Sequence, residues 1–214
     1  MSAGPEPRNR RGRPRLGEEE GRRTAILEAA FAELAERGYT AATMLGIARR
    51  AGASKETLYS RFGDKRGLFA ELIRHQAEQT NARAATALAR DLPPREALTG
   101  FATGLLRLLL GPRSVAINRA AITAPELAET LLEQGRHTTG PMVARYLADL
   151  AADGVLAIDD PEDAFRLLYG LVVADSQIRV LLGELPPTDL DRRARTAVDR
   201  FLTLTAGAHL DRAD

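Results

Sequence analysis

The sequence contains no cysteine, and aromatic residues make up only 5% of it. Without cysteine the chain can form no disulfide, thiol sensor or thiolate metal site. No apolar run approaches the length of a membrane span, and the arginine-rich start lacks the apolar core of a secretory signal. We therefore expect a cytoplasmic protein with no membrane partner.

The sustained alternation of apolar and polar residues that marks β-strands is also missing, as are internal repeats. Helical spacing recurs instead, so we predict an all-α fold of about nine or ten helices. With 214 residues, 44% of them hydrophobic, the chain can bury one core or a small domain on a larger one. Helices are expected at residues 19–37, two short ones within 43–62, then 64–90, 94–110, 114–123, 125–140, 141–153, 161–182 and 189–207.

Catalytic and metal-binding constellations are absent from the sequence. His75, His137 and His209 lie far apart, and none has a second ligand at metal spacing. Phosphate-binding glycine patterns and nucleophile elbows are missing too. We expect no catalytic residue, metal or cofactor, and a helical enzyme is the alternative that the sequence favours least.

Charge is distributed unevenly, although the net charge is only +1. Residues 8–15 carry five arginines and no acid. We predict that residues 1–17 form a disordered basic arm that follows a DNA minor groove or backbone. Within the arm, Arg10, Arg11 and Arg13 are the expected contacts, and a solubilising tail is the alternative.

Residues 38–69 predict two short helices joined by a tight turn. Thr43 and Ser54 suit the N-cap positions, and Gly52 can end the first helix in the left-handed conformation. Apolar residues at helical spacing would face inward: Met44, Ile47, Ala48, Ala51, Leu58 and Phe62. The outward set would be Lys55, Glu56, Thr57, Tyr59, Ser60 and Arg61. This surface suits a helix in a DNA major groove, and a hairpin with a merely solvated face is the alternative.

Individual side chains of the second short helix suggest particular contacts. Lys55 suits guanine O6 and N7, and Thr57 can meet a thymine methyl group. Glu56 could accept from a cytosine amino group or serve instead as a capping partner.

At these positions the chain resembles the TetR family of transcriptional regulators. The matching residues lie within about 24–72 and include Ile47-Ala48, Ala51-Gly52-Ala53-Ser54, Thr57-Leu58-Tyr59, Phe62, Asp64-Lys65 and Leu68. The resemblance implies a three-helix DNA-binding head (residues 18–67) on a larger ligand-binding and dimerisation body (68–214). It also implies phosphate contacts from Thr43, Tyr59 and Lys65.

The C-terminal part is similar to the AefR-like subgroup of that family, through Asn118-Arg119-Ala120-Ala121, Pro125-Glu126-Leu127-Ala128, Gly154-Val155-Leu156 and residues 160–164. The family resemblance implies a ligand pocket inside the body. Candidate lining residues are Phe101, Leu105, Arg119, Tyr146, Tyr169, Val173 and Gln177. Core packing is the alternative for Phe101, Leu105 and Val173. A buried Arg119 would seek Asp175 or an anionic ligand.

The segments 161–182 and 189–207 are too apolar for a monomer surface. Their large apolar residues are Phe165, Leu168, Leu171, Val172, Ile178, Leu181, Leu182, Val198, Phe201 and Leu202. The resemblance implies that both segments pair with their counterparts in a homodimer. We expect a repressor that binds a palindromic double-stranded operator and is released by a small-molecule effector, with a constitutive regulator as the alternative.

Overall fold

A computed structural model of the chain describes residues 16–89 and 91–206, and these contain helices, turns and loops but no strand. The predicted all-α class is confirmed. The helices are α1 (Leu16–Ala41), α2 (Met44–Ala51), α3 (Lys55–Phe62), α4 (Lys65–Ala87), α5 (Pro94–Leu109), α6 (Pro112–Thr123), α7 (Pro125–Leu131), α8 (His137–Ala152), α9 (Pro161–Val173), α10 (Ser176–Leu181) and α11 (Leu190–Leu204). A π-helical turn, η1 (Leu132–Arg136), joins α7 to α8. None of the helices in the described part of the chain is long and apolar enough to cross a lipid bilayer.

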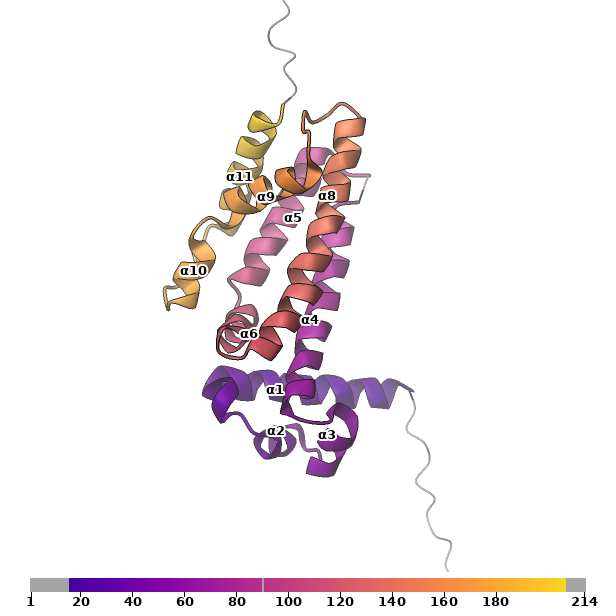
Figure 1. Cartoon of the computed structure of the whole chain (residues 1–214), viewed down its shortest axis with the longest axis vertical. Coiled ribbons are helices and arrows are strands. Elements are labelled where there is room, and N and C mark those ends of the chain that lie inside the picture. The colour runs from indigo at the N-terminus through magenta and orange to yellow at the C-terminus, as the bar shows by residue number, and fades with distance from the viewer. Residues whose placement is uncertain (1–15, 90, 207–214) are drawn as a thin grey trace, which may run out of the picture.

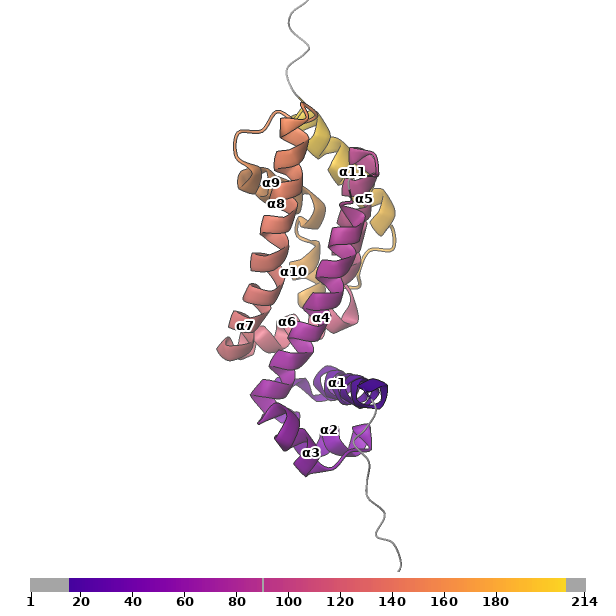
Figure 2. The same cartoon turned by 90° about the vertical axis from the view of Figure 1, so that its right-hand side faces the viewer.

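The helices form an elongated molecule with a small head at one end. Figure 1 shows α1 lying crosswise beneath the helices of the body, with α2 and α3 below it. Helix α4 leaves this head and runs upward into the body, where α5, α8, α9 and α11 pack together (Figures 1 and 2). Helix α4 is therefore the continuous element that connects the two parts.

The core of the head includes residues from the body. Helix α1 contributes an apolar stripe with Leu27 and Leu34, which packs on Ile47 and Leu58 of the two short helices. The first turns of α4 and part of α6 and α7 complete this cluster: Leu68, Phe69, Leu72, Ile73, Ile117, Ala120, Ala121, Ala124 and Leu127. Burying one large aliphatic side chain contributes about 1.5–3 kcal/mol. This shared core couples the position of the head to α6 and α7.

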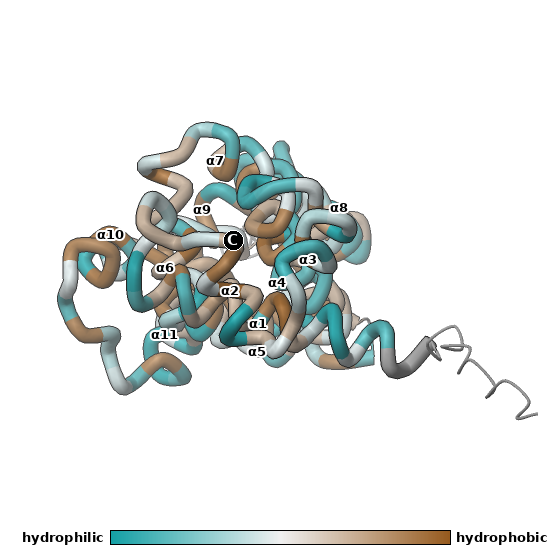
Figure 3. Tube along the Cα trace, turned by 90° about the horizontal axis from the view of Figure 1, so that it is seen from below, coloured by the Kyte–Doolittle hydropathy of each residue, from teal (hydrophilic) through white to brown (hydrophobic). Residues whose placement is uncertain are grey.

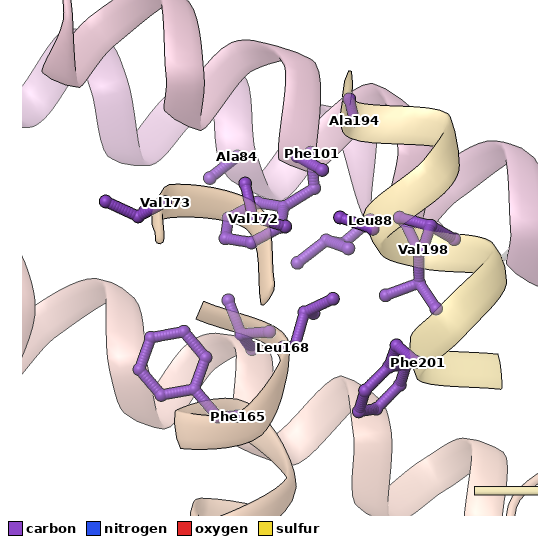
Figure 4. Close-up of a cluster of buried hydrophobic side chains, with 14 of the residues drawn as sticks. Ala84, Leu88, Phe101, Phe165, Leu168, Val172, Val173, Ala194, Val198 and Phe201 are labelled. Carbon is purple, nitrogen blue, oxygen red and sulfur yellow. The ribbon is translucent and has the colours of Figure 1, made fainter. Parts of the chain in front are cut away.

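Most of the large apolar residues in 161–207 lie in the core of the body or pack against it. Figure 4 shows Leu168 and Val172 of α9 with Val198 and Phe201 of α11 in one cluster of buried side chains. Phe201 is 0% exposed within the single chain. Most of the apolar set is thus covered within one chain, chiefly by α5 and α8, so its apolar character alone does not require a partner. The pairing of both segments in a homodimer stays a prediction. Ile178 and Leu182 are the members of the set that remain exposed.

Three predicted helix ends differ from the structure or are refined by it. The segment 161–182 is broken at Ala174, whose φ of 44° lies in the left-handed region, so α10 forms separately. The expected interruption at Gly140–Pro141 was wrong, because α8 runs through Pro141. The widened turn η1 lies just before this proline, which lacks the N–H of an ordinary helical residue. Gly38 breaks α1 as expected (φ 71°, ψ 168°), and one further turn reaches Ala41.

Candidate nucleic-acid interface

Helices α2 and α3 form a helix-turn-helix whose caps are those expected from the sequence. The Thr43 hydroxyl oxygen accepts a hydrogen bond from the Gly46 amide at 3.0 Å. Gly52 closes α2 with φ 61° and ψ 28°. The Ser54 hydroxyl oxygen accepts from the Thr57 amide at 3.1 Å and opens α3. Local sequence therefore fixes where α2 ends and where α3 begins.

One face of α3 is polar and open to solvent. Lys55, Glu56, Thr57, Tyr59 and Ser60 are all exposed, whereas Leu58 on the opposite face is 0% exposed. Tyr59 is 44% exposed, so its ring is not a packing element of the head core. The Lys55 ammonium lies 5.4 Å from the centroid of that ring. A short helix with such a face can present donors and acceptors to a DNA groove.

Glu56 interacts with the start of its own helix. Hydrogen bonds from its own backbone amide and from the Ser54 hydroxyl lower the pKa of the Glu56 carboxyl, with a smaller effect of the Lys55 charge. The carboxylate thus stabilises the positive end of the α3 dipole. This geometry favours the capping role over the base contact, which stays a prediction.

Lys65 lies at the first position of α4 and faces the end of α1. Its ammonium donates to the main-chain carbonyl oxygens of Tyr39, Thr40 and Ala42 at 2.9, 3.3 and 3.3 Å. It also lies 4.6 Å from the centroid of the Tyr39 ring. An ammonium has three donors, so Lys65 fastens α4 to α1. The phosphate contact stays a prediction, and the structure gives this side chain an internal role that the sequence did not indicate.

Glu33 is a buried acid that sequence reasoning missed. It is 2% exposed in the head, and its Oε1 accepts no hydrogen bond from the described residues. Arg37 and Arg50 lie 3.4 and 3.8 Å from the carboxylate. A Cβ atom on Gly46 would lie 2.4 Å from Oε1, so glycine allows α1 and the first turn of α2 to approach closely. The position of Glu33, seven residues after Ile26 on the apolar stripe, was the signal available in the sequence.

The body candidates occupy two kinds of position. Phe101, Tyr146 and Val173 are buried in the body core, and Leu105 and Tyr169 are partly buried against it. The Tyr169 hydroxyl donates to Gln177 Oε1 at 3.5 Å, and the Arg136 guanidinium lies 4.6 Å from the Tyr169 ring centroid. Burial raises the pKa of Tyr169, although Arg136 opposes this shift. Tyr169 and Gln177 thus form a polar pair at the edge of an apolar core.

Arg119 does not lie where we expected. It is exposed on α6 and donates to the carbonyl oxygens of Leu181 and Val180 at 3.0 and 3.2 Å. Asp175 instead pairs with Arg179 at 3.6 Å. The expectations that Arg119 is buried and that it pairs with Asp175 were wrong, because the carbonyl groups that end α10 accept hydrogen bonds from the guanidinium instead. Contact with an anionic ligand, the other partner expected for Arg119, stays a prediction.

Arg119 also lines a solvent-open groove of about 560 Å³ between α6 and the end of α1. Among the described residues, no three histidine or acidic side chains gather at a distance suited to a metal ion. The expected arm contacts, Arg10, Arg11 and Arg13, lie outside the residues that the structure describes.

Comparisons with known proteins match both parts of the chain. Residues 26–72 match the family of bacterial regulatory proteins called tetR, and residues 96–204 match the C-terminal domain of AefR-like transcriptional repressors. A TetR transcriptional regulator of Agrobacterium tumefaciens is 37% identical, with a TM-score of 0.72, over 88% of this chain and 96% of that one. The flavonoid-responsive regulator FrrA is 29% identical, with a TM-score of 0.66, over 88% of this chain and 99% of that one.

A curated relative matches over a shorter stretch. The HTH-type transcriptional regulator BetI of Agrobacterium fabrum is 37% identical over 88 residues, which are 41% of this chain and 43% of that protein. The match therefore spans less than half the length of this relative.

Proposed function

The chain belongs to the TetR family of transcriptional regulators, and we propose that it is a cytoplasmic repressor that binds a palindromic operator as a homodimer. The observation that carries this proposal is the exposed polar face of α3, held by Leu58 against the head core. The description of the matched C-terminal domain as that of a repressor supports the direction of regulation. No catalytic activity is part of the proposal.

In the proposed complex, α3 lies in the major groove. Lys55 donates to guanine, and the Thr57 methyl group meets a thymine methyl group. Thr43, Ser60 and Tyr59 lie beside the phosphate backbone, where hydroxyl groups fix the register without reading sequence. A two-fold axis between the protomers gives the operator the same symmetry.

Release by a small-molecule effector is the second part of the proposal. FrrA is described as flavonoid-responsive, and it is similar to this chain over almost its whole length. We place the polar anchors of a body pocket at Tyr169 and Gln177, whose side-chain oxygens lie 3.5 Å apart beside apolar residues. A mostly apolar site with few polar anchors is typical of ligand pockets.

Selection of binding sites from a random duplex pool tests the DNA-binding part. We expect an inverted repeat whose half-sites are about one helical turn apart or a multiple of it. Lys55→Ala protein should return a repeat with one relaxed base pair in each half-site. A pool that returns no inverted repeat with the wild-type protein contradicts the proposal.

A further inference from the structure

The groove between α1 and α6 lies where the head meets the body. Figure 1 shows α6 directly above one end of α1, and Figure 2 shows the same layering from the side. Leu34 and Ala35 of α1 line the groove together with Val115 and Ala116 of α6, and Ala35 and Ala116 are the more exposed of these residues. Its volume of about 560 Å³ falls within the range of small-molecule sites, about 300–1,000 Å³.

The charge of the groove selects one class of ligand. Arg37 lines the wall from α1 and Arg119 the wall from α6, and none of the described residues that line the groove is acidic. Arg37 also lies 3.4 Å from the buried Glu33 carboxylate, and Arg119 uses Nε and Nη2 for carbonyl oxygens of α10, so an anion in the groove meets their remaining N–H groups. Thr40 adds an exposed hydroxyl group to the wall, whereas the hydroxyl groups of Tyr39 and Thr123 already donate to Glu126 and to the Ala120 carbonyl oxygen. Guanidinium N–H groups donate charge-assisted hydrogen bonds to carboxylates and sulfonates, so this composition suits an apolar molecule with one anionic group.

We propose that the groove is a binding site for a small amphipathic organic anion. The apolar part of the ligand lies against the accessible residues Ala35, Pro112 and Ala116, and its anionic group meets Arg37 and Arg119. The site is separate from the body pair Tyr169–Gln177, which shares no lining residue with it.

A ligand at this place affects the head directly, because the two walls belong to different parts of the molecule. Tyr39 and Thr40 line the groove, and the carbonyl oxygens of both accept hydrogen bonds from Lys65 at the start of α4. The Tyr39 hydroxyl donates to Glu126 Oε1 of α7 at 3.3 Å. A ligand that separates the walls therefore shifts the end of α1 relative to the body. The effect on DNA rests on the proposed operator binding, since the head carries α3.

Two fluorescent probes with the same aromatic core test the site in the full-length protein. 1-Anilinonaphthalene-8-sulfonate carries an anionic group, and N-phenyl-1-naphthylamine lacks it. We expect saturable binding of the sulfonate at one site per chain. Arg37→Gln and Arg119→Gln should each weaken sulfonate binding about tenfold, in line with the loss of a charge-assisted contact, and leave the neutral probe unchanged. Arg22→Gln, on an exposed position of α1 outside the groove, is the matched control.

A steric variant provides an independent measurement. Ala35 is exposed on the α1 wall, so Ala35→Trp should fold normally while it fills the groove and abolishes binding of both probes. Ala25→Trp, at another exposed position of α1, is the control and should bind both probes as the wild type does. Sulfonate binding that survives Ala35→Trp, or that responds only to Tyr169→Phe and Gln177→Leu, overturns the proposal, as does the absence of saturable binding.

Operator binding is measured separately, by fluorescence anisotropy of the selected DNA. Saturating sulfonate should weaken operator binding of the wild type about fivefold or more and leave the Ala35→Trp protein unaffected. An unchanged operator affinity overturns the claim that a ligand in the groove affects DNA binding. The probe titrations still test whether the groove binds the anion. If the wild type binds no palindromic DNA, the proposed function fails, and the titrations again decide the groove on their own.

Discussion

The ammonium nitrogen of Lys65 lies 2.9 Å from the main-chain carbonyl oxygen of Tyr39, and this contact joins the start of α4 to the end of α1. The side chain continues the last turn of α1 by capping carbonyl groups that have no helical partner ahead of them. Tyr39 extends the connection by stacking edge-on against Phe69, with ring centroids 5.3 Å apart. Lys65, which was expected to contact a DNA phosphate, thus holds the end of α1 against the start of α4.

Removal of this ammonium should destabilise the head in the absence of DNA. Lys65→Met keeps most of the aliphatic stem but removes three hydrogen bonds, so we expect the free energy of unfolding to fall by about 2 kcal/mol. Urea denaturation measures this. Lys55→Met is the matched control, since Lys55 is exposed, and should change the free energy of unfolding by less than about 0.5 kcal/mol. Wild-type stability with weaker binding at every DNA site would restore the phosphate role.

Two substitutions on α3 should have different effects on DNA recognition. Lys55→Ala removes a base contact, so we expect a loss of discrimination of about 1–3 kcal/mol at one base pair in each half-site. Tyr59→Phe removes a hydroxyl placed beside phosphate, so binding to all sequences should weaken alike. Competition assays with operators that carry single base changes measure both effects. Equal loss by Lys55→Ala at every position would assign Lys55 to the phosphate backbone instead.

The features of the site that could be predicted from the sequence depend on neighbours within one turn of a helix. Thr43 and Ser54 cap α2 and α3 through amides three residues ahead, and Leu58 is buried as its spacing indicated. Such contacts follow from the order of residues alone. The all-α class and the three-helix head could be predicted for the same reason.

The features that could not be predicted depend on partners far away in the chain. Arg119 finds carbonyl groups of α10, and Lys65 finds those at the end of α1, neither of which a local pattern reveals. Ala174 ends α9 with a positive φ, although no glycine or proline marks the position. The apolar residues of α9 and α11 suggested a dimer surface because their coverage by α5 and α8 is a tertiary property.

Glu71 should make stability depend on acid pH. Burial alone would raise the pKa of its carboxyl, but hydrogen bonds from Arg23 and Arg74 outweigh that effect and lower the pKa. A carboxyl with a lowered pKa stabilises the fold above its unfolded pKa of about 4.3, and this contribution is lost as the pH falls through the folded value. Glu71→Gln should lower the free energy of unfolding by about 1 kcal/mol at pH 7. Denaturation at a series of pH values should show this difference shrinking below pH 4, whereas a constant difference contradicts the linkage.

Deletion of residues 1–15 tests the basic arm and leaves α1, which begins at Leu16, intact. Each phosphate contact that is lost should lower the slope of log affinity against log salt by about 0.9. Full-length protein with Arg10, Arg11 and Arg13 replaced by glutamine separates the charge from the length of the arm. An unchanged slope in both proteins identifies the segment as a solubilising tail.

Two substitutions distinguish an exposed apolar surface, on which we expect the protomers to pair, from the core of a single chain. Leu182 is 80% exposed after α10, and Ile178 of the same helix is 52% exposed; Figure 3 shows this apolar segment at the rim of the molecule. When two protomers pair around a two-fold axis, the same apolar patch of each protomer is buried in one interface. Leu182→Glu should therefore yield a folded monomer in sedimentation at micromolar concentration, with an unchanged circular dichroism spectrum. Phe201→Asp, in contrast, places a charge in the core and should unfold the chain, at a cost of several kcal/mol.

The folded Leu182→Glu monomer should also bind the operator poorly, because a single head contacts only one half-site. Leu204→Glu provides a comparison on the neighbouring helix, since Leu204 is 65% exposed near the end of α11. If both variants remain dimers that bind the operator with wild-type affinity, the protomers must meet through a surface other than α10 and α11.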